Sequence, residues 1–198
     1  YQAWRYYFRI VNAANLVIQG LGGNDVVLTD AKNKASMGQA KALRAYAYFY
    51  LSQLFATHYD AGEKLLPIYL EPNGPAKPQS TMKEVYDLIT KDLNEALTLI
   101  NGFTRRDRYQ INTDVAKSLL AYVYAYRGTA ADNAKAKQLA DEVIASGTPI
   151  TTRENIVGGF NDIHKNPSWL WGVDITLDNG LDLISWWGQM DYFTYSYQ

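Results

Sequence analysis

The sequence of 198 residues contains no cysteine. This absence excludes disulfide frameworks, thiolate zinc sites and thiol nucleophiles together, although it leaves the redox compartment open. Histidine is almost absent too, with only His58 and His164 in the chain. Asp60 and Glu63 lie near His58 and suggest a metal site, but a turn histidine beside a helix end accounts for the same grouping. We therefore expect no metal and no other cofactor.

Charge of neither sign is in excess, because 19 basic residues balance 20 acidic ones and the formal net charge is −1. A phosphate backbone is therefore not favoured electrostatically as a partner, and we expect no nucleic-acid binding. Long apolar runs are also lacking, since no stretch reaches the roughly 18 residues that indicate a membrane span. The N-terminal residues YQAWRYYFRI form an amphipathic helical pattern, whereas a signal peptide has a basic start and an apolar run.

Catalytic motifs are missing as well. Glycoside hydrolysis needs two carboxyl groups close together in a cleft, and no spacing singles out such a pair among the 20 acidic residues. The glycines at 20, 22 and 23 are not followed by the lysine and hydroxyl residue of a phosphate-binding loop. We expect no enzymatic activity, and keep a small hydrolase only as a minor alternative.

Aromatic residues are abundant, at 14% of the chain, with 16 tyrosines and 5 tryptophans. Tyrosine combines a flat apolar ring with a polar hydroxyl group, so it suits both helix packing and wet recognition surfaces. The excess alone does not decide between these two roles.

Helical periodicity runs through the first three quarters of the sequence. Apolar residues recur at the i, i+3, i+4 spacing of one helical face, and glycines interrupt the pattern. Ser36 is a candidate N-cap of the second helix and Asp132 of the fifth, while Thr81 and Glu84 form a capping-box pattern at the third. The five predicted helices cover residues 4–18, 38–55, 81–100, 113–127 and 132–146.

The second predicted helix is apolar nearly all round, which indicates burial between neighbours on both sides. Ala45 and Phe49 fit the A-x-x-x-F element of the tetratricopeptide repeat, although the W-x-x-L-G-x-x-Y element is missing. We therefore predict an all-α fold of irregular, tetratricopeptide-like stacked helical hairpins over residues 1–147.

Residues 148–198 form a second, less regular segment. Trp169, Trp171, Val173 and Ile175 alternate with other residues at the period of a half-buried strand, and we expect both tryptophans to be core residues. The final residues, ISWWGQMDYFTYSYQ, show no register and stop without a cap or a polar tail. We interpret the chain as a fragment of a longer protein.

Five blocks of the sequence, in this order, resemble the SusD/RagB family of surface glycan-binding lipoproteins of Bacteroidetes. They are GQAKALRAYAYFYLSQL at 38–54, Leu66-Pro67, STMKEVYDLITKDLNEAL at 80–97, TDVAKSLLAYVY at 113–124 and AKAKQLADEVIASG at 134–147. Together they extend over about the first three quarters of the chain.

The sequence also departs from the family's pattern. Members are generally several hundred residues long and begin with a signal peptide and a lipidated cysteine, and this chain has neither these nor the long C-terminal half. Phe55-Ala56 replaces an aromatic-glycine step, and Gln79 replaces an arginine before the third helix. The first departure concerns the membrane anchor and the completeness of a ligand site, and the other two concern local packing.

The resemblance implies a non-enzymatic role at the outer-membrane surface. A member of this family holds an oligosaccharide or polysaccharide and delivers it to a SusC-like TonB-dependent transporter, over which it sits as a lid. Contact with the membrane would then depend on a lipid anchor that this sequence does not contain.

Candidate glycan-binding residues combine flat aromatic rings, which stack on sugar faces, with amide and carboxylate groups, which bind hydroxyl groups. Filling the seam with a missing half of the protein explains the C-terminal aromatics more readily than glycan binding does, and an ordinary solvated loop more readily explains the asparagine and aspartate. The candidates are Trp186, Trp187, Gln189, Asp191, Tyr192 and Tyr195, together with Asn24 and Asp25 in the glycine-bearing loop.

A helical scaffold that binds a protein or peptide and no sugar is the alternative function. The sequence does not identify the glycan.

Overall fold

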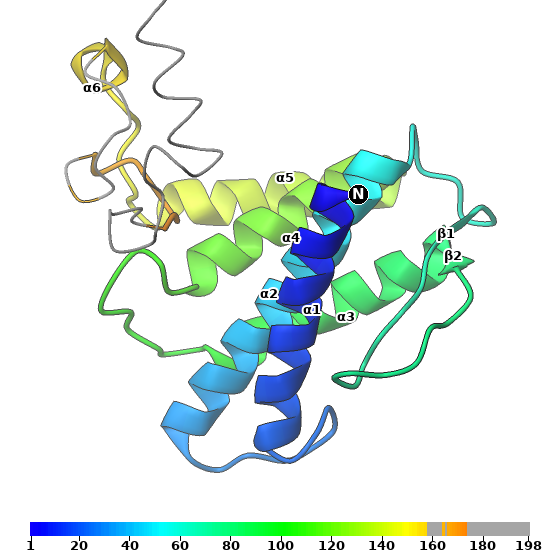
Figure 1. Ribbon diagram of the computed structural model, residues 1–198. Helices are drawn as coiled ribbons and strands as arrows, with labels where there is room; N and C mark the ends of the chain where they lie inside the picture. The colour runs from blue at the N-terminus through cyan, green and yellow to red at the C-terminus, as the bar shows by residue number, and fades with distance from the viewer. Residues whose placement is uncertain (158–163, 165, 174–198) are drawn as a thin grey trace, which may run out of the picture.

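The computed structural model describes residues 1–157, 164 and 166–173 of the chain (Figure 1). The described part is mainly helical, with one short pair of antiparallel strands. Its elements are α1 (Gln2–Gly20), α2 (Ala31–Phe55), β1 (Lys64–Leu66), β2 (Ser80–Thr81), α3 (Met82–Leu99), α4 (Thr113–Arg127), α5 (Ala130–Ala145) and α6 (Arg153–Val157).

Helix α2 begins earlier than the sequence predicted, at Ala31 instead of near Gly38. The prediction of Ser36 as its N-cap is wrong, because the side chain of Asp30 accepts the hydrogen bond from the Asn33 N–H, at 2.8 Å. The first two turns of α2 carry few apolar residues, so hydrophobic periodicity does not reveal them, and the cap alone marks the start.

Helix α3 begins with the predicted capping box. Thr81 accepts a hydrogen bond from the Glu84 N–H, and the Glu84 carboxylate accepts one from the Thr81 N–H. Helix α4 ends as predicted at Gly128, whose φ of 71° is a left-handed conformation that glycine adopts without strain. The predicted cap of α5 is wrong: Thr129 is the N-cap, and Asp132 lies three residues inside the helix.

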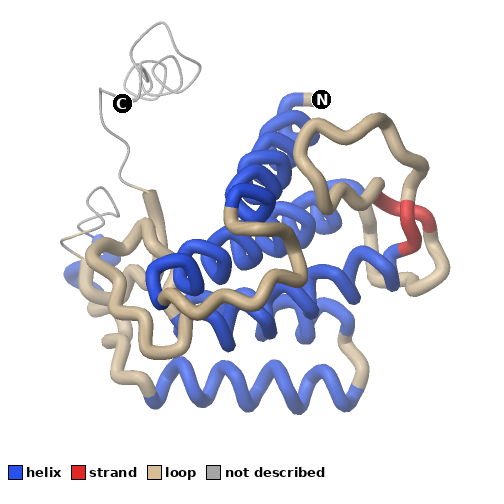
Figure 2. The backbone as a smooth tube through the Cα atoms, turned by 90° about the horizontal axis from the view of Figure 1, so that it is seen from below, coloured by secondary structure: helices blue, strands red, loops and turns tan. Residues whose placement is uncertain are grey.

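The helices pack in the order of the chain. Helix α2 lies between α1 and α3, helix α4 packs against α3, and α5 lies outermost against α4 (Figures 1 and 2). The strand pair β1–β2 lies at one edge of the helices, ahead of α3 (Figure 2). The predicted all-α stack is confirmed, and so is the prediction that the second helix is enclosed on two sides.

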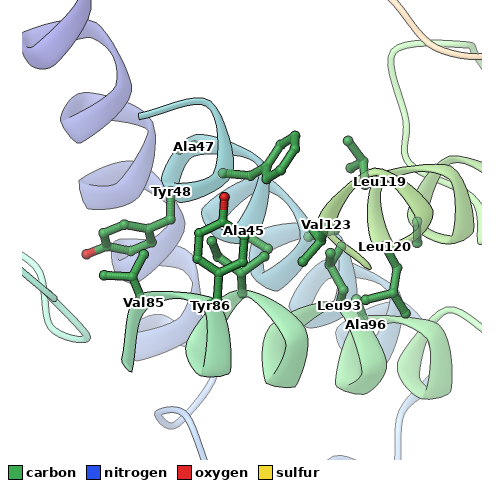
Figure 3. Packing of buried hydrophobic residues seen from close by; sticks show 14 of the residues in the cluster. Ala45, Ala47, Tyr48, Val85, Tyr86, Leu93, Ala96, Leu119, Leu120 and Val123 are labelled. Atoms are coloured by element: carbon green, nitrogen blue, oxygen red, sulfur yellow. The ribbon is translucent and has the colours of Figure 1, made fainter. Parts of the chain in front are cut away.

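The core lies between α2, α3 and α4. Figure 3 shows Tyr48 of α2 beside Val85 and Tyr86 of α3. Leu119, Leu120 and Val123 of α4 complete the same cluster. Alanines on α2 allow the backbones to approach closely, and at Gly38 the approach is so close that an added Cβ would lie 2.5 Å from Cγ2 of Ile100.

The strand predicted around Trp169 and Trp171 is absent from residues 169–173, the part of that stretch that the structure describes. This segment is irregular, and both tryptophans are half-buried against the helices. Leu170 and Trp171 both pack against the core, whereas Val173 is exposed, so the alternation of residue types does not correspond to two faces of this segment.

Candidate functional site

A groove in the described surface is lined by α1, α2, α4 and residues 169–173, and we call it the aromatic groove. Its volume is about 890 Å³. Six of its lining residues are aromatic: Tyr6, Tyr46, Tyr50, Tyr122, Trp169 and Trp171.

The rings on α2 pack against one another along the groove. Tyr46 and Tyr50 have centroids 4.7 Å apart, and Tyr7 of α1 lies parallel to Tyr50 at 6.2 Å. Burial raises the pKa of Tyr46 well above its usual value, and the neighbouring Tyr7 adds to this shift. Burial also raises the pKa of Tyr50. The phenols of Tyr46 and Tyr50 therefore stay protonated at neutral pH, so they can donate hydrogen bonds and bring no negative charge into the groove.

Residues 169–173 line the groove and are tied to the connection between α3 and α4. The indole N–H of Trp171 donates to the carbonyl oxygen of Tyr109, at 2.9 Å, and the ring meets Tyr46 edge to face, at 5.2 Å. The Arg105 guanidinium donates to the carbonyl oxygen of Leu170, at 2.6 Å. One aromatic wall of the groove is therefore held by the backbone of a distant loop.

A buried ion pair lies beneath a second part of the surface. Arg44 on α2 donates to both carboxylate oxygens of Asp92 on α3, at 2.7 and 2.8 Å, and each side chain is 1% exposed. Burial raises the pKa of Asp92, and the two hydrogen bonds from Arg44 oppose this shift. Two further N–H groups of Arg44 donate to the amide oxygens of Asn15 and Asn24, each at 2.8 Å.

These two amides extend the ion pair to the loop that follows β1. The Asn15 side chain donates to the carbonyl oxygens of Tyr69 and Glu71, at 3.0 and 3.3 Å. The Asn24 side chain donates to the carbonyl oxygen of Leu70, at 3.1 Å. Three consecutive carbonyl groups are thus held by two amides that a buried guanidinium orients.

Asn24 and Asp25 are the two predicted site residues that the structure describes. Asn24 uses both its amide oxygen and its amide nitrogen inside the protein, and its own carbonyl oxygen accepts a hydrogen bond from Lys41, at 2.9 Å. Asp25 is 89% exposed and lies 3.7 Å from the Lys91 amine. Both stay predictions as glycan-binding residues. The other six candidates, Trp186, Trp187, Gln189, Asp191, Tyr192 and Tyr195, lie outside the described residues.

Among the described residues, no three histidine, aspartate or glutamate side chains form a group that could hold a metal ion. No helix in the described part combines the length and the hydropathy that crossing a bilayer requires.

Comparison with known proteins identifies the family. A family profile described as "Starch-binding associating with outer membrane" matches residues 1–125. The chain belongs to the SusD-like family.

Solved structures of SusD-like proteins share this fold. A SusD-like carbohydrate-binding protein from Bacteroides vulgatus is 28% identical with a TM-score of 0.79, and the match covers 89% of this chain and 37% of that one. A laminarin-binding SusD-like protein is also 28% identical, with a TM-score of 0.57 and coverage of 76% and 31%. A structure with xylogluco-oligosaccharide is 25% identical, with a TM-score of 0.61 and coverage of 75% and 30%.

The SusD-like chain thus spans about a third of the length of these solved proteins. No curated protein matches its sequence significantly.

The buried ion pair of this SusD-like chain could not be identified from hydrophobic periodicity. Arg44 and Asp92 are polar residues in helices, and polar residues are normally expected to face water. The L-R-A motif at 43–45 was part of the family resemblance, but its arginine was not recognised as a buried residue that organises two loops.

Proposed function

We propose that this protein holds an oligosaccharide or polysaccharide at the surface of the outer membrane and delivers it to a SusC-like TonB-dependent transporter, without catalysis. Membership of a family of carbohydrate-binding proteins associated with the outer membrane supports this proposal. One relative is named for binding laminarin, and another structure contains a xylogluco-oligosaccharide.

The aromatic groove is the structural observation that carries the proposal. Pyranose rings present apolar C–H faces that stack on flat aromatic rings, and the protonated phenols can meet hydroxyl groups. Tyr46, Tyr50 and Trp171 supply such rings on a surface with an open side.

The proposal also assigns roles to the glycan-binding residues that the sequence predicted. We assign stacking to Trp186, Trp187, Tyr192 and Tyr195, because each offers an aromatic face. We assign hydroxyl recognition to polar side chains between and beside them, namely Gln189, Asp191, Asn24 and Asp25.

Titration with a polysaccharide panel tests glycan binding. We expect a saturable shift of tryptophan fluorescence with at least one polysaccharide, and about tenfold weaker binding after Trp186→Ala and Trp187→Ala. Tyr1→Ala, at a ring that is 87% exposed beside Arg5, is the matched control and should bind as the original chain does.

A helical scaffold for a peptide partner is the second candidate function. The groove also presents apolar residues on three helices, such as Ile10, Leu43 and Leu119, and these suit the apolar face of a partner helix. Silence with every polysaccharide, together with binding to a fragment of a SusC-like transporter, would favour the scaffold. Release of reducing sugar during prolonged incubation would contradict both.

A further inference from the structure

A second depression lies on the other side of α1, between this helix and the loop of residues 67–74. We call it the α1 cleft. Its volume is about 270 Å³, which is below the roughly 300–1,000 Å³ typical of drug-sized ligand pockets. The cleft therefore suits one small ring, whereas the aromatic groove has room for several.

Aromatic side chains form the apolar walls of the α1 cleft. Trp4 and Phe8 lie one turn apart on α1, with ring centroids 4.7 Å apart. Tyr69 of the loop meets Phe8 edge to face, at 5.7 Å. Such walls exclude water from the faces of a ring placed between the helix and the loop.

Residues with polar groups that have no internal partner line the same cleft, and we call these groups the rim. Glu71 and Asn73 are exposed lining residues, and no hydrogen bond within the described part of the chain uses the Glu71 carboxylate, the Asn73 side-chain amide nitrogen or the indole N–H of Trp4. The rim thus offers an acceptor with two oxygens and donors on two further side chains. Hydroxyl groups on a sugar ring both donate and accept, so they match this combination.

The conformation of Asn73 is unusual. With a φ of 56°, it is the one non-glycine residue with positive φ in the described part of the chain. Its N–H donates to the side-chain oxygen of Asn12, at 2.8 Å, and its own side-chain oxygen accepts from the Asn12 amide, at 3.3 Å. This exchange holds the left-handed turn against α1 and leaves the Asn73 amide nitrogen free to donate.

The loop wall of the cleft is held from below by the buried ion pair. Asn15 and Asn24, oriented by Arg44, bind the carbonyl groups of residues 69–71. Tyr48 adds a further anchor, because its hydroxyl oxygen accepts from the Tyr69 N–H, at 2.7 Å. A loop fixed at four backbone groups of three consecutive residues keeps its shape before any ligand arrives, which reduces the entropy lost on binding.

We propose that the α1 cleft binds one pyranose ring of a neutral glycan, with Glu71 and Asn73 binding its hydroxyl groups and Trp4 and Tyr69 enclosing the ring. This inference rests on the proposed function and adds a site for a single residue at a chain end or branch. Arg44 and Asn24 act as positioning residues that shape the loop from outside the cleft, whereas Asn15 both holds the loop and lines the cleft.

Titration by NMR tests this site in the whole chain. The probes are methyl glycosides of glucose, galactose, mannose and xylose, together with laminari- and xylogluco-oligosaccharides. We expect at least one probe to shift the Trp4 indole and Asn73 side-chain amide signals along one saturable curve.

Two variants remove the rim groups without disturbing the core. Glu71→Gln removes the charge. Asn73→Gly removes the amide, and with it the 3.3 Å hydrogen bond from the Asn12 amide, while it tolerates the positive φ and keeps the N–H that donates to Asn12. Each should weaken binding about tenfold, because hydrogen bonds to a charged or otherwise unpaired group contribute the most. Glu63→Gln, at another exposed loop glutamate outside the cleft, is the matched control and should bind as the original chain does.

The outcomes separate this inference from the proposed function. Saturable sugar binding that leaves the Trp4 and Asn73 signals unmoved, or that both variants retain in full, overturns the α1 cleft and leaves the proposed function standing. Failure of every probe and every polysaccharide to bind overturns both.

Discussion

Arg44 joins three parts of the described chain that are far apart in sequence. Its guanidinium joins α1 through Asn15, the following loop through Asn24, and α3 through Asp92. A buried cation is costly unless it is fully paired, and here the donors of Arg44 meet three oxygen-bearing side chains. The ion pair therefore specifies how these segments fit together, and its net contribution to stability is smaller than its four hydrogen bonds suggest.

Replacing one residue of this ion pair should show how much its buried, unpaired partner lowers the free energy of unfolding. We expect Asp92→Leu to lower the free energy of unfolding by about 3–5 kcal/mol, because it leaves Arg44 buried without a counter-charge. The double variant Asp92→Leu with Arg44→Met should recover part of that loss. Urea unfolding followed by circular dichroism measures both.

Asp87→Asn, in an exposed pair with Lys83, is the control and should change stability by no more than about 0.5 kcal/mol. Equal effects of Asp92→Leu and Asp87→Asn would contradict this view of the pair.

The capping box of α3 should make stability depend on pH. The Glu84 carboxylate accepts hydrogen bonds from the Thr81 N–H and from the Thr81 hydroxyl group. Both hydrogen bonds hold the pKa of Glu84 below its usual value of 4.5, and the one from the N–H has the larger effect. A lowered pKa in the folded state means that the stabilisation is complete above pH 4.5 and is lost as the pH falls through the folded value. Melting temperatures should therefore differ between the original chain and Glu84→Gln at pH 7, and this difference should shrink at pH 3. A difference that persists unchanged in acid would show that the charge of Glu84 plays no part.

At the scale of elements, the sequence determines helices better than their first turns. The capping box of α3 and the glycine that ends α4 were predictable because single residue types perform these tasks. The start of α2 was missed because residues 31–37 show no apolar stripe, and the strand around Trp171 was wrongly predicted because alternation also arises in an irregular segment that packs on helices.

The crossing of α2 and the end of α3 depends on the absence of a side chain at position 38. A Cβ there would lie 2.5 Å from Cγ2 of Ile100 and 3.1 Å from Cβ of Leu99. We expect Gly38→Ala to destabilise the fold by about 1–3 kcal/mol through overpacking, although alanine favours helix by itself. Gly20→Ala is the matched control, because Gly20 also lies in a helix and has open space around its Cα. Gly20→Ala should be neutral or stabilising. Thermal unfolding measures the stability of both variants, and equal effects of Gly38→Ala and Gly20→Ala would contradict this prediction.

At the scale of the whole molecule, each helix from α1 to α5 packs mainly on its neighbours in sequence. Helix α5 contacts α4 and no other described helix, and Asp132 is its one fully buried residue, whereas α2 buries residues along most of its length. Stability in such stacks is shared between nearest neighbours, so an end element opens at a lower free energy than a central one.

Native-state hydrogen exchange should therefore distinguish the two ends of the stack. We expect amides of α5 to exchange at a lower opening free energy than those of α2 and α3. Leu139→Ala, which trims a half-buried contact of α5, should accelerate exchange in α5 more than in α2. Uniform protection across all helices, or equal acceleration in α2, would contradict this order.

The site was less predictable than the stack, for physical reasons. Asn24 was singled out from sequence because it lies in a polar loop, but the partners of its side chain come from α2 and from residue 70, and no local pattern reveals such long-range pairing. The α1 cleft likewise combines residues of α1 with residues some 60 positions later, as the hydrogen bonds between Asn12 and Asn73 show. The family resemblance implied sugar recognition, and the place that we propose for it depends on contacts that only the tertiary fold brings together.

The pairing of Arg44 with Asp92 also has a consequence for how the protein is made. Arg44 leaves the ribosome 48 residues before its counter-charge, which at roughly 5–20 residues per second is a delay of about 2–10 s. During this interval the hairpin formed by α1 and α2 contains the Arg44 cation without its counter-charge, so this hairpin cannot reach its final packing. Nascent chains arrested before residue 92 emerges should be cut readily by protease within the first hairpin, and those arrested well beyond it should resist.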